Sequence, residues 1–187
     1  FSPPKCRGDS PQASGESPHS PPTRAREFII NNKWLILLKR NEPNPLCPFF
    51  INFDPPVLFL DVDGVLNTRP GSLDADKLDL VRQLIADTGC LVCLSSSWRL
   101  VERQKARICA ELPIWRVTPE IGPWNRGDEI RAFLAAHPTV QRFAILDDCS
   151  NGWGELGSHW VYCDASRGFG LDEFKLALSL LSGKAAA

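Results

Sequence analysis

Two pairs of carboxylates are the residues of this sequence best suited to chemistry, because each pair directly follows an apolar run. Asp61 and Asp63 end the stretch LFLDVD, and Asp147 and Asp148 end the stretch AILDD. Unpaired charges beside a buried strand are costly, so each pair requires a neutralising partner. Carboxylate oxygens suit a hard cation, most simply Mg²⁺, and we predict that all four residues contribute to one magnesium site.

A cation surrounded by carboxylates suits phosphoryl transfer, because it neutralises the charge on the substrate's oxygens. We predict that Asp61 attacks phosphorus as a nucleophile and forms an aspartyl-phosphate. Asp63, two residues further on, would protonate the leaving oxygen and later deprotonate water. Gly64 allows the chain to turn away, so that phosphate can approach in line. These two carboxylates are therefore the predicted catalytic residues.

Phosphate oxygens need further donors, and three side chains are suitably placed to supply them. Ser95 and Ser96 follow the apolar run LVCL, and Arg126 lies where a helix is predicted to start. Each has a structural alternative when considered singly: the serines could form only a helix-capping turn, and Arg126 could be a solvated loop charge. Each carboxylate pair could likewise belong to a simple turn. The joint placement of two such pairs after two apolar runs favours the functional interpretation.

The elements that would position these residues form a regular series. From Pro56 onward, short apolar runs alternate with amphipathic stretches, as βα units require. We expect an α/β fold with a doubly wound, five-stranded parallel sheet of order 3-2-1-4-5. In that order, strands one and four are neighbours, so the two carboxylate pairs meet at one edge. The predicted strands are 57–62, 91–94, 114–117, 142–146 and 160–163, and the predicted helices are 75–88, 101–112, 127–137 and 171–182.

The first 55 residues differ in composition from the rest of the chain. Residues 1–26 are rich in Pro and Ser and have few large apolar side chains, so we expect them to be disordered. Residues 27–55 are expected to be a poorly defined linker or appendage, and 56–184 the catalytic domain. The chain opens on Phe1 and contains no Met, which predicts a fragment that lacks its native start.

Charge and cysteine content restrict the classes of partner. Residues 1–50 hold seven Lys and Arg against four Asp and Glu, which leaves 14 against 18 in the remainder. An acidic domain is not a general nucleic-acid binder, so a phosphate-bearing partner must be held by a local cluster or a cation. Seven scattered Cys, with Cys90 and Cys93 as the only CxxC pair, suggest packed thiols in a reducing compartment. No apolar run is long enough to span a membrane, and we expect a cytoplasmic protein with no membrane partner.

Four segments together resemble the motifs of the haloacid dehalogenase (HAD) superfamily. LFLDVDGVLNT resembles motif I, LVCLSSSWR motif II, Arg126 in RGDEI the cation of motif III, and AILDD motif IV. The resemblance implies a Rossmann-like fold, Mg²⁺ dependence and catalysis through an aspartyl-phosphate. Asp63 distinguishes activities within the superfamily, because a phosphatase needs an acid there to expel a poor leaving group.

Within this superfamily, the SSSWR, RGDEIRAFL and AILDD segments are most similar to the HAD domain of Swiss Army Knife RNA repair proteins. That pattern usually has a further acidic residue where this chain has Cys149, and a Trp where it has Phe133. The first departure leaves open which of Asp147 and Asp148 binds the metal. The second is interpreted as aromatic packing.

Residues 67–90 and 100–125 leave no room for a cap domain, so we expect an open site. Such a site resembles members of the superfamily that act on large substrates, such as nucleic-acid ends or phosphoproteins, or that close by oligomerising. We therefore predict a phosphatase, a phosphomonoester hydrolase that acts on terminal phosphates of RNA or DNA in RNA repair. Two alternatives are a catalytically silent phosphate-binding module and a phosphatase for nucleotides or other small molecules. Tryptophans in the loops could stack on a base, although buried packing is commoner. The candidate substrate contacts are Asn67, Arg69, Trp98 and Arg99.

Overall fold

The computed structural model describes residues 55–122, 125–150 and 152–183. The predictions of a disordered segment over 1–26 and of a linker over 27–55 concern residues outside this part of the chain, apart from Pro55. The described domain contains one five-stranded sheet with the order β3-β2-β1-β4-β5, and all its strand pairs are parallel. The predicted α/β fold and sheet order are therefore confirmed.

The strands form where the short apolar runs were predicted. β1 lies at the centre, with Leu60 opposite Leu94 of β2 and Leu146 of β4, so all three strands reach the same edge. All four residues of β1 are fully buried, as expected for a strand covered on both faces. The strands are β1 (Val57–Leu60), β2 (Leu91–Leu94), β3 (Ile114–Val117), β4 (Phe143–Asp147) and β5 (Trp160–Tyr162).

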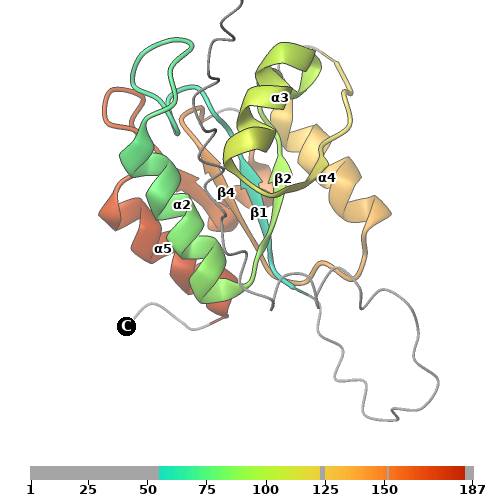
Figure 1. Cartoon of the computed structure of the whole chain (residues 1–187). Helices are drawn as coiled ribbons and strands as arrows, with labels where there is room; N and C mark the ends of the chain where they lie inside the picture. Colours follow the sequence, from blue (N-terminus) through green and yellow to red (C-terminus); the bar gives the residue numbers. More distant parts are fainter. Residues whose placement is uncertain (1–54, 123–124, 151, 184–187) are drawn as a thin grey trace, which may run out of the picture. The chain divides into compact units, whose positions relative to one another are not determined.

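The four predicted helices are present, with ends that differ by no more than one residue. Figure 1 shows α2 and α5 on one side of the sheet and α3 and α4 on the other. Gly89 ends α2 in the left-handed conformation with φ 67°, a common way for a helix to end. The helices are α2 (Ala75–Thr88), α3 (Glu102–Glu111), α4 (Arg126–Ala136) and α5 (Leu171–Ser182).

Two short 3₁₀ helices were not predicted. η2 (Ser97–Leu100) follows β2 directly, and η3 (Gly154–His159) occupies much of the loop expected before β5. Asp74 is the N-cap residue of α2, but its side chain forms no capping hydrogen bond with the helix. Its carboxylate accepts hydrogen bonds from the Thr68 N–H and hydroxyl, both at 3.1 Å, and so ties down the turn after β1.

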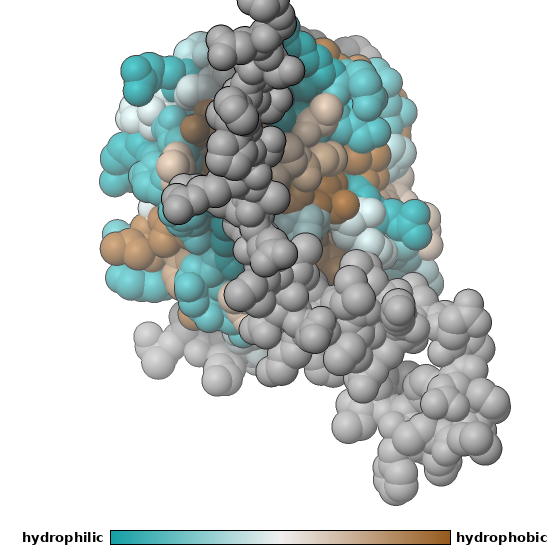
Figure 2. All heavy atoms as spheres, viewed as in Figure 1, coloured by the Kyte–Doolittle hydropathy of each residue, from teal (hydrophilic) through white to brown (hydrophobic). Residues whose placement is uncertain are grey.

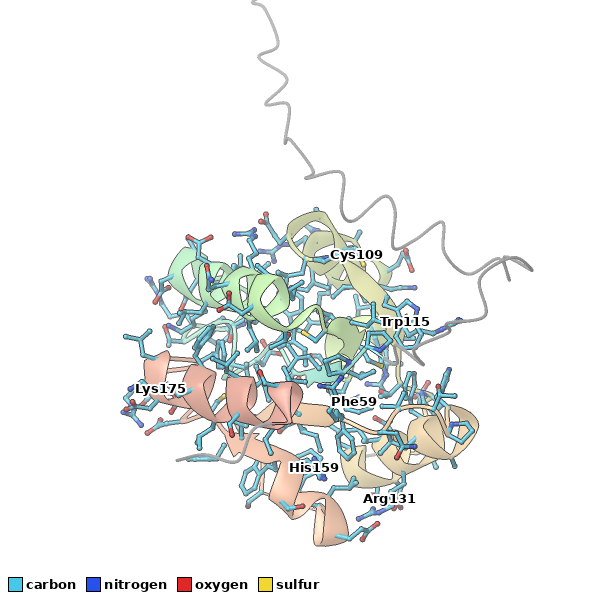
Figure 3. All side chains as sticks on the ribbon, turned by 90° about the horizontal axis from the view of Figure 1, so that it is seen from below. Phe59, Cys109, Trp115, Arg131, His159 and Lys175 are labelled. Atoms are coloured by element: carbon cyan, nitrogen blue, oxygen red, sulfur yellow. The ribbon has the colours of Figure 1, made fainter. Side chains whose placement is uncertain are left out.

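Aromatic side chains fill the core between the sheet and α4. The Phe59 ring meets Phe133 of α4 edge to face at 5.4 Å between centroids, and meets Phe143 of β4 at 5.8 Å. Figure 3 shows Phe59 in the interior and Arg131 and Lys175 at the periphery. Phe133 is 3% exposed, which agrees with its interpretation as a packing residue. This packing holds α4 against the sheet.

The cysteines of the sheet are free and buried. Cys90 and Cys93 do not pair, and burial raises the pKa of their thiols to about 11 and about 12. Packing therefore accounts for the CxxC pair.

Among the described helices, none combines the length and apolar character that a membrane span requires.

Some large apolar side chains remain at the surface. Figure 2 shows apolar residues near the position of β2 and α4 in Figure 1, surrounded by hydrophilic ones.

Within the described ranges, the connections around the sheet are short. Residues 61–90 contain only α2, and residues 95–122 contain only η2, α3 and β3. Neither segment contains a cap domain, as predicted.

Candidate active site

Asp61 is the first residue after β1 and is almost completely buried, with 4% exposure. Its backbone N–H donates to the Leu146 carbonyl at 3.0 Å, which extends the pairing of β1 with β4 by one residue. Gly64 then turns the chain with φ +73°. A Cβ at this position would lie 2.4 Å from the Asp148 Oδ2 atom, so a side chain would displace that carboxylate. Gly64 is therefore required by both conformation and space.

Arg126 joins the carboxylates of two neighbouring strands. Its Nη1 atom lies 2.9 Å from Asp61 Oδ2 and 2.5 Å from Asp147 Oδ2. Burial lowers the pKa of Arg126, but the two carboxylates more than offset this and raise it above its usual value. Arg126 is the first residue of α4, and the Asn125 side chain caps this helix by accepting the Asp128 N–H at 3.3 Å. The predicted motif III cation therefore lies at the carboxylate cluster.

Asp147 is fully buried and has both side-chain oxygens engaged. Oδ2 contacts Arg126, and Oδ1 accepts the Cys149 N–H at 2.8 Å. Burial and the charge of Asp61 raise the pKa of Asp147 to about 6, against the opposing effect of Arg126. Burial and the charges of Asp61 and Asp63 also raise the pKa of Asp148. The two motif IV carboxylates and the Cys149 thiol place ligand atoms within 4.8 Å of one another.

Asp63 is exposed, in contrast to Asp61, and is held by uncharged donors. The Trp98 indole Nε1–H donates to Oδ2 at 2.9 Å, and the Asn67 amide donates to Oδ1 at 2.9 Å. The Asn67 Oδ1 atom accepts the Gly64 N–H at 3.0 Å, so Asn67 also stabilises the turn. The two carboxylates of LFLDVD therefore lie in different electrostatic environments.

The two serines at the end of β2 have different surroundings. Ser96 Oγ accepts the Trp98 N–H at 3.3 Å and so caps η2. Ser95 Oγ is buried and has no hydrogen-bond partner in the described part of the chain. A buried hydroxyl left without a partner is unfavourable. Ser95 is therefore the better candidate to bind a ligand oxygen.

Arg99 connects three parts of the domain from a buried position. Its Nη1 atom donates to the Ser95 and Ser96 carbonyls, both at 2.9 Å, and its Nε donates to the Thr118 carbonyl after β3 at 3.1 Å. Its Nη2 atom forms an ion pair of 2.5 Å with Glu129 of α4. The side chains of Arg99 and Glu129 are only 4% and 7% exposed. This contact fixes the serine turn relative to the helix that begins with Arg126.

Three of the four candidate substrate contacts have structural partners. Trp98 is 1% exposed and presents no free face on which a base could stack. Arg99 is engaged with backbone carbonyls and Glu129, and Asn67 is 2% exposed within its own turn. These three side chains are therefore part of the packed interior, which is the commoner role for buried residues of this kind. Arg69 is exposed and stays a candidate contact.

Two residues that support the site were missed by the sequence interpretation. Glu129 was not among the candidate residues, although it is the partner of Arg99. Arg107 of α3 was not singled out, yet its guanidinium lies 5.4 Å from the centroid of the Trp98 ring. Because their partners lie 30 and 9 residues away on other elements, local sequence carried no signal for either contact.

A parallel sheet of this order, with carboxylates after two adjacent strands and a cation from a following helix, defines a HAD-type domain. The family model described as the HAD domain in Swiss Army Knife RNA repair proteins matches residues 57–174, and the chain belongs to this family. Comparisons with curated proteins and with solved structures each gave no match.

Removal of the Arg99 guanidinium should strongly destabilise the domain. In Arg99→Gln, Glu129 remains buried without its cation, and we expect the free energy of unfolding to fall by roughly 3–5 kcal/mol. Urea unfolding followed by circular dichroism measures this change. Arg103→Gln, at an exposed position of the next helix, is the matched control and should change stability by less than about 0.5 kcal/mol. A loss below about 1 kcal/mol in Arg99→Gln would show that this contact does not hold the site together.

The raised pKa of Asp147 predicts a pH dependence of stability without divalent cations. The folded protein binds this proton up to about pH 6, whereas an unfolded aspartate releases it near about pH 4. The free energy of unfolding should therefore decrease as the pH rises between these values, by roughly 1–3 kcal/mol. Asp147→Asn should lack this part of the decrease. Urea unfolding of both proteins in a chelating buffer at about pH 4 and about pH 7 tests this, and identical pH dependence would contradict it.

Proposed function

We propose that this domain is a Mg²⁺-dependent phosphomonoesterase that works through an aspartyl-phosphate on Asp61. The observation that carries the proposal is the difference between the two motif I carboxylates. Asp61 is buried against Arg126, whereas Asp63 is exposed and held by Trp98 and Asn67. Two carboxylates in such different environments are suited to different tasks.

Asp61 is suited to act as the nucleophile. Its Oδ2 atom is held by Arg126, and Oδ1 would form the bond to phosphorus while the bond to the leaving oxygen breaks. Asp63 would give its proton to the leaving oxygen and later take one from the attacking water. Arg126 and the Ser95 hydroxyl would bind the remaining phosphoryl oxygens.

The donor set at this edge fits a magnesium ion. It consists of carboxylate oxygens, which hard cations prefer, and burial together with the charge of Asp61 raises the pKa of Asp147 and Asp148. Asp61, the backbone carbonyl of Asp63, and the two motif IV carboxylates would hold the ion. When bound, Mg²⁺ would offset the negative charge of the phosphoryl group.

We further propose terminal phosphates of RNA or DNA as the substrate. Membership of a family named for RNA repair proteins supports this choice. The described connections contain no cap domain, and Asp63 is exposed, so a large substrate could approach. Arg69, exposed in the turn after β1, is suited to contact the polyanion.

Asp61→Asn should abolish turnover. We expect Mg²⁺-dependent phosphate release from 4-nitrophenyl phosphate to fall by roughly 10³-fold or more, because an amide cannot replace the nucleophile. Asp172→Asn, at an exposed position of α5, is the control and should retain the wild-type rate. Equal rates for wild type and Asp61→Asn would exclude Asp61 as the nucleophile.

Beryllium fluoride mimics an aspartyl-phosphate, and we expect it to bind the wild type but not Asp61→Asn. If the wild type binds Mg²⁺ but not beryllium fluoride, the result would favour a silent binding module.

The substrate class is tested with a panel of phosphate esters. We expect kcat/KM for end-phosphorylated oligonucleotides to exceed that for mononucleotides and sugar phosphates by about tenfold or more, and to fall as salt is added. Arg69→Gln should lower kcat/KM for oligonucleotides about threefold or more and leave 4-nitrophenyl phosphate hydrolysis unchanged. A clear preference for small phosphate esters would refute the RNA or DNA substrate.

A further inference from the structure

The Trp98 indole links the two turns that carry the candidate catalytic and phosphate-binding residues. Its Nε1–H donates to Asp63 Oδ2 at 2.9 Å, although the two residues are 35 positions apart. Trp98 belongs to η2, which follows Ser95 and Ser96 at the end of β2. One hydrogen bond therefore ties the candidate acid of the β1 turn to the β2 turn.

The two oxygens of the Asp63 carboxylate are held from different sides. Oδ2 accepts from Trp98, whereas Oδ1 accepts from Asn67 within the same turn. Because each oxygen has its own directional donor, rotation of the carboxylate about the Cβ–Cγ bond is restricted. Removal of the indole N–H would leave only the local donor, and the carboxylate could then rotate.

Trp98 is itself fixed within the domain. Its backbone N–H donates to Ser96 Oγ, and its ring is 1% exposed. The Arg107 guanidinium lies 5.4 Å from the ring centroid, a cation–π contact, and its Nη1 atom donates to the Gly71 carbonyl at 2.9 Å. An indole N–H is only a donor and carries no charge. It can therefore orient Asp63 without adding a further charge to the site.

We propose that Trp98 is a positioning residue, which holds Asp63 in the orientation that delivers its proton to the leaving oxygen. This inference rests on the proposed function. As the bond from Asp61 Oδ1 to phosphorus forms and the bond to the leaving oxygen breaks, the Asp63 proton passes to that oxygen. A weakly basic leaving group needs little of this proton, whereas an alkoxide depends on it.

The dependence on the leaving group provides the test. Trp98→Phe keeps an aromatic ring but removes the N–H. With the full chain and Mg²⁺, we compare kcat/KM, which reports formation of the aspartyl-phosphate and not its later hydrolysis. We expect it to change less than about threefold for 4-nitrophenyl phosphate and to fall roughly 10- to 100-fold for an alkyl phosphate. Trp115→Phe, whose ring packs on Phe133 and His137, should keep the wild-type dependence.

A double-mutant cycle separates positioning from a general structural role. Asp63→Ala removes the acceptor, and in that background Trp98→Phe should have no further effect on kcat/KM for the alkyl phosphate. Additive losses in the cycle, or an unchanged alkyl-to-aryl rate ratio in Trp98→Phe, would overturn the positioning role while the phosphatase assignment stands. A wild-type protein that hydrolyses none of these esters would instead refute the proposed function, and the inference with it.

A second measurement applies even when Trp98→Phe does not fold. Solvent exchange of the Trp98 indole proton can be followed by NMR in the wild type and in Asp63→Ala. We expect exchange to become about tenfold faster or more without the carboxylate, because the hydrogen bond must open before exchange. An equal exchange rate in both proteins would overturn the inference.

Discussion

The rest of this domain depends on the ion pairs that two buried carboxylates form with one guanidinium. Asp61 follows β1 and Asp147 is the last residue of the adjacent parallel strand β4, so their charges are brought together where little water remains. Burial, followed by the charge of Asp61, raises the pKa of Asp147, because both disfavour its ionised form. Arg126 contacts both carboxylates with a single nitrogen atom, so one positive charge is shared between them. The position of α4, which begins with this arginine, is therefore set by electrostatics as well as by packing.

Three long-range contacts fix the positions of the turns at the carboxyl edge of the sheet relative to one another. Arg126 connects α4 to the ends of β1 and β4, and Arg99 connects the turn after β2 to α4 through Glu129. Trp98 connects the same β2 turn to the β1 turn through Asp63. Each contact begins on one element and ends on another, so the site residues are restrained before any ligand binds. Restraint of this kind is what precise catalytic geometry requires.

The two motif I carboxylates show how one short stretch can supply two different chemical groups. Asp61 continues the strand pairing and is buried with a cation, whereas Asp63 lies beyond the strand end and is exposed. Gly64 makes this possible, because its left-handed conformation turns the chain at once and leaves space for Asp148. The contrast between the two environments comes from the turn rather than from the residue types, which are identical.

Local sequence by itself determined the strands, the helices, the sheet order and the residues that the sheet brings to one edge. These features follow from apolar periodicity, from glycine at turns, and from the rule that adjacent parallel strands end at the same edge. Only the tertiary structure decided that Trp98 and Arg99 face inward, that Ser95 rather than Ser96 has the free hydroxyl, and that Glu129 supports the site. The physical reason is that burial and hydrogen-bond partners depend on elements far apart in the chain, whereas a sequence motif records only residue type and spacing.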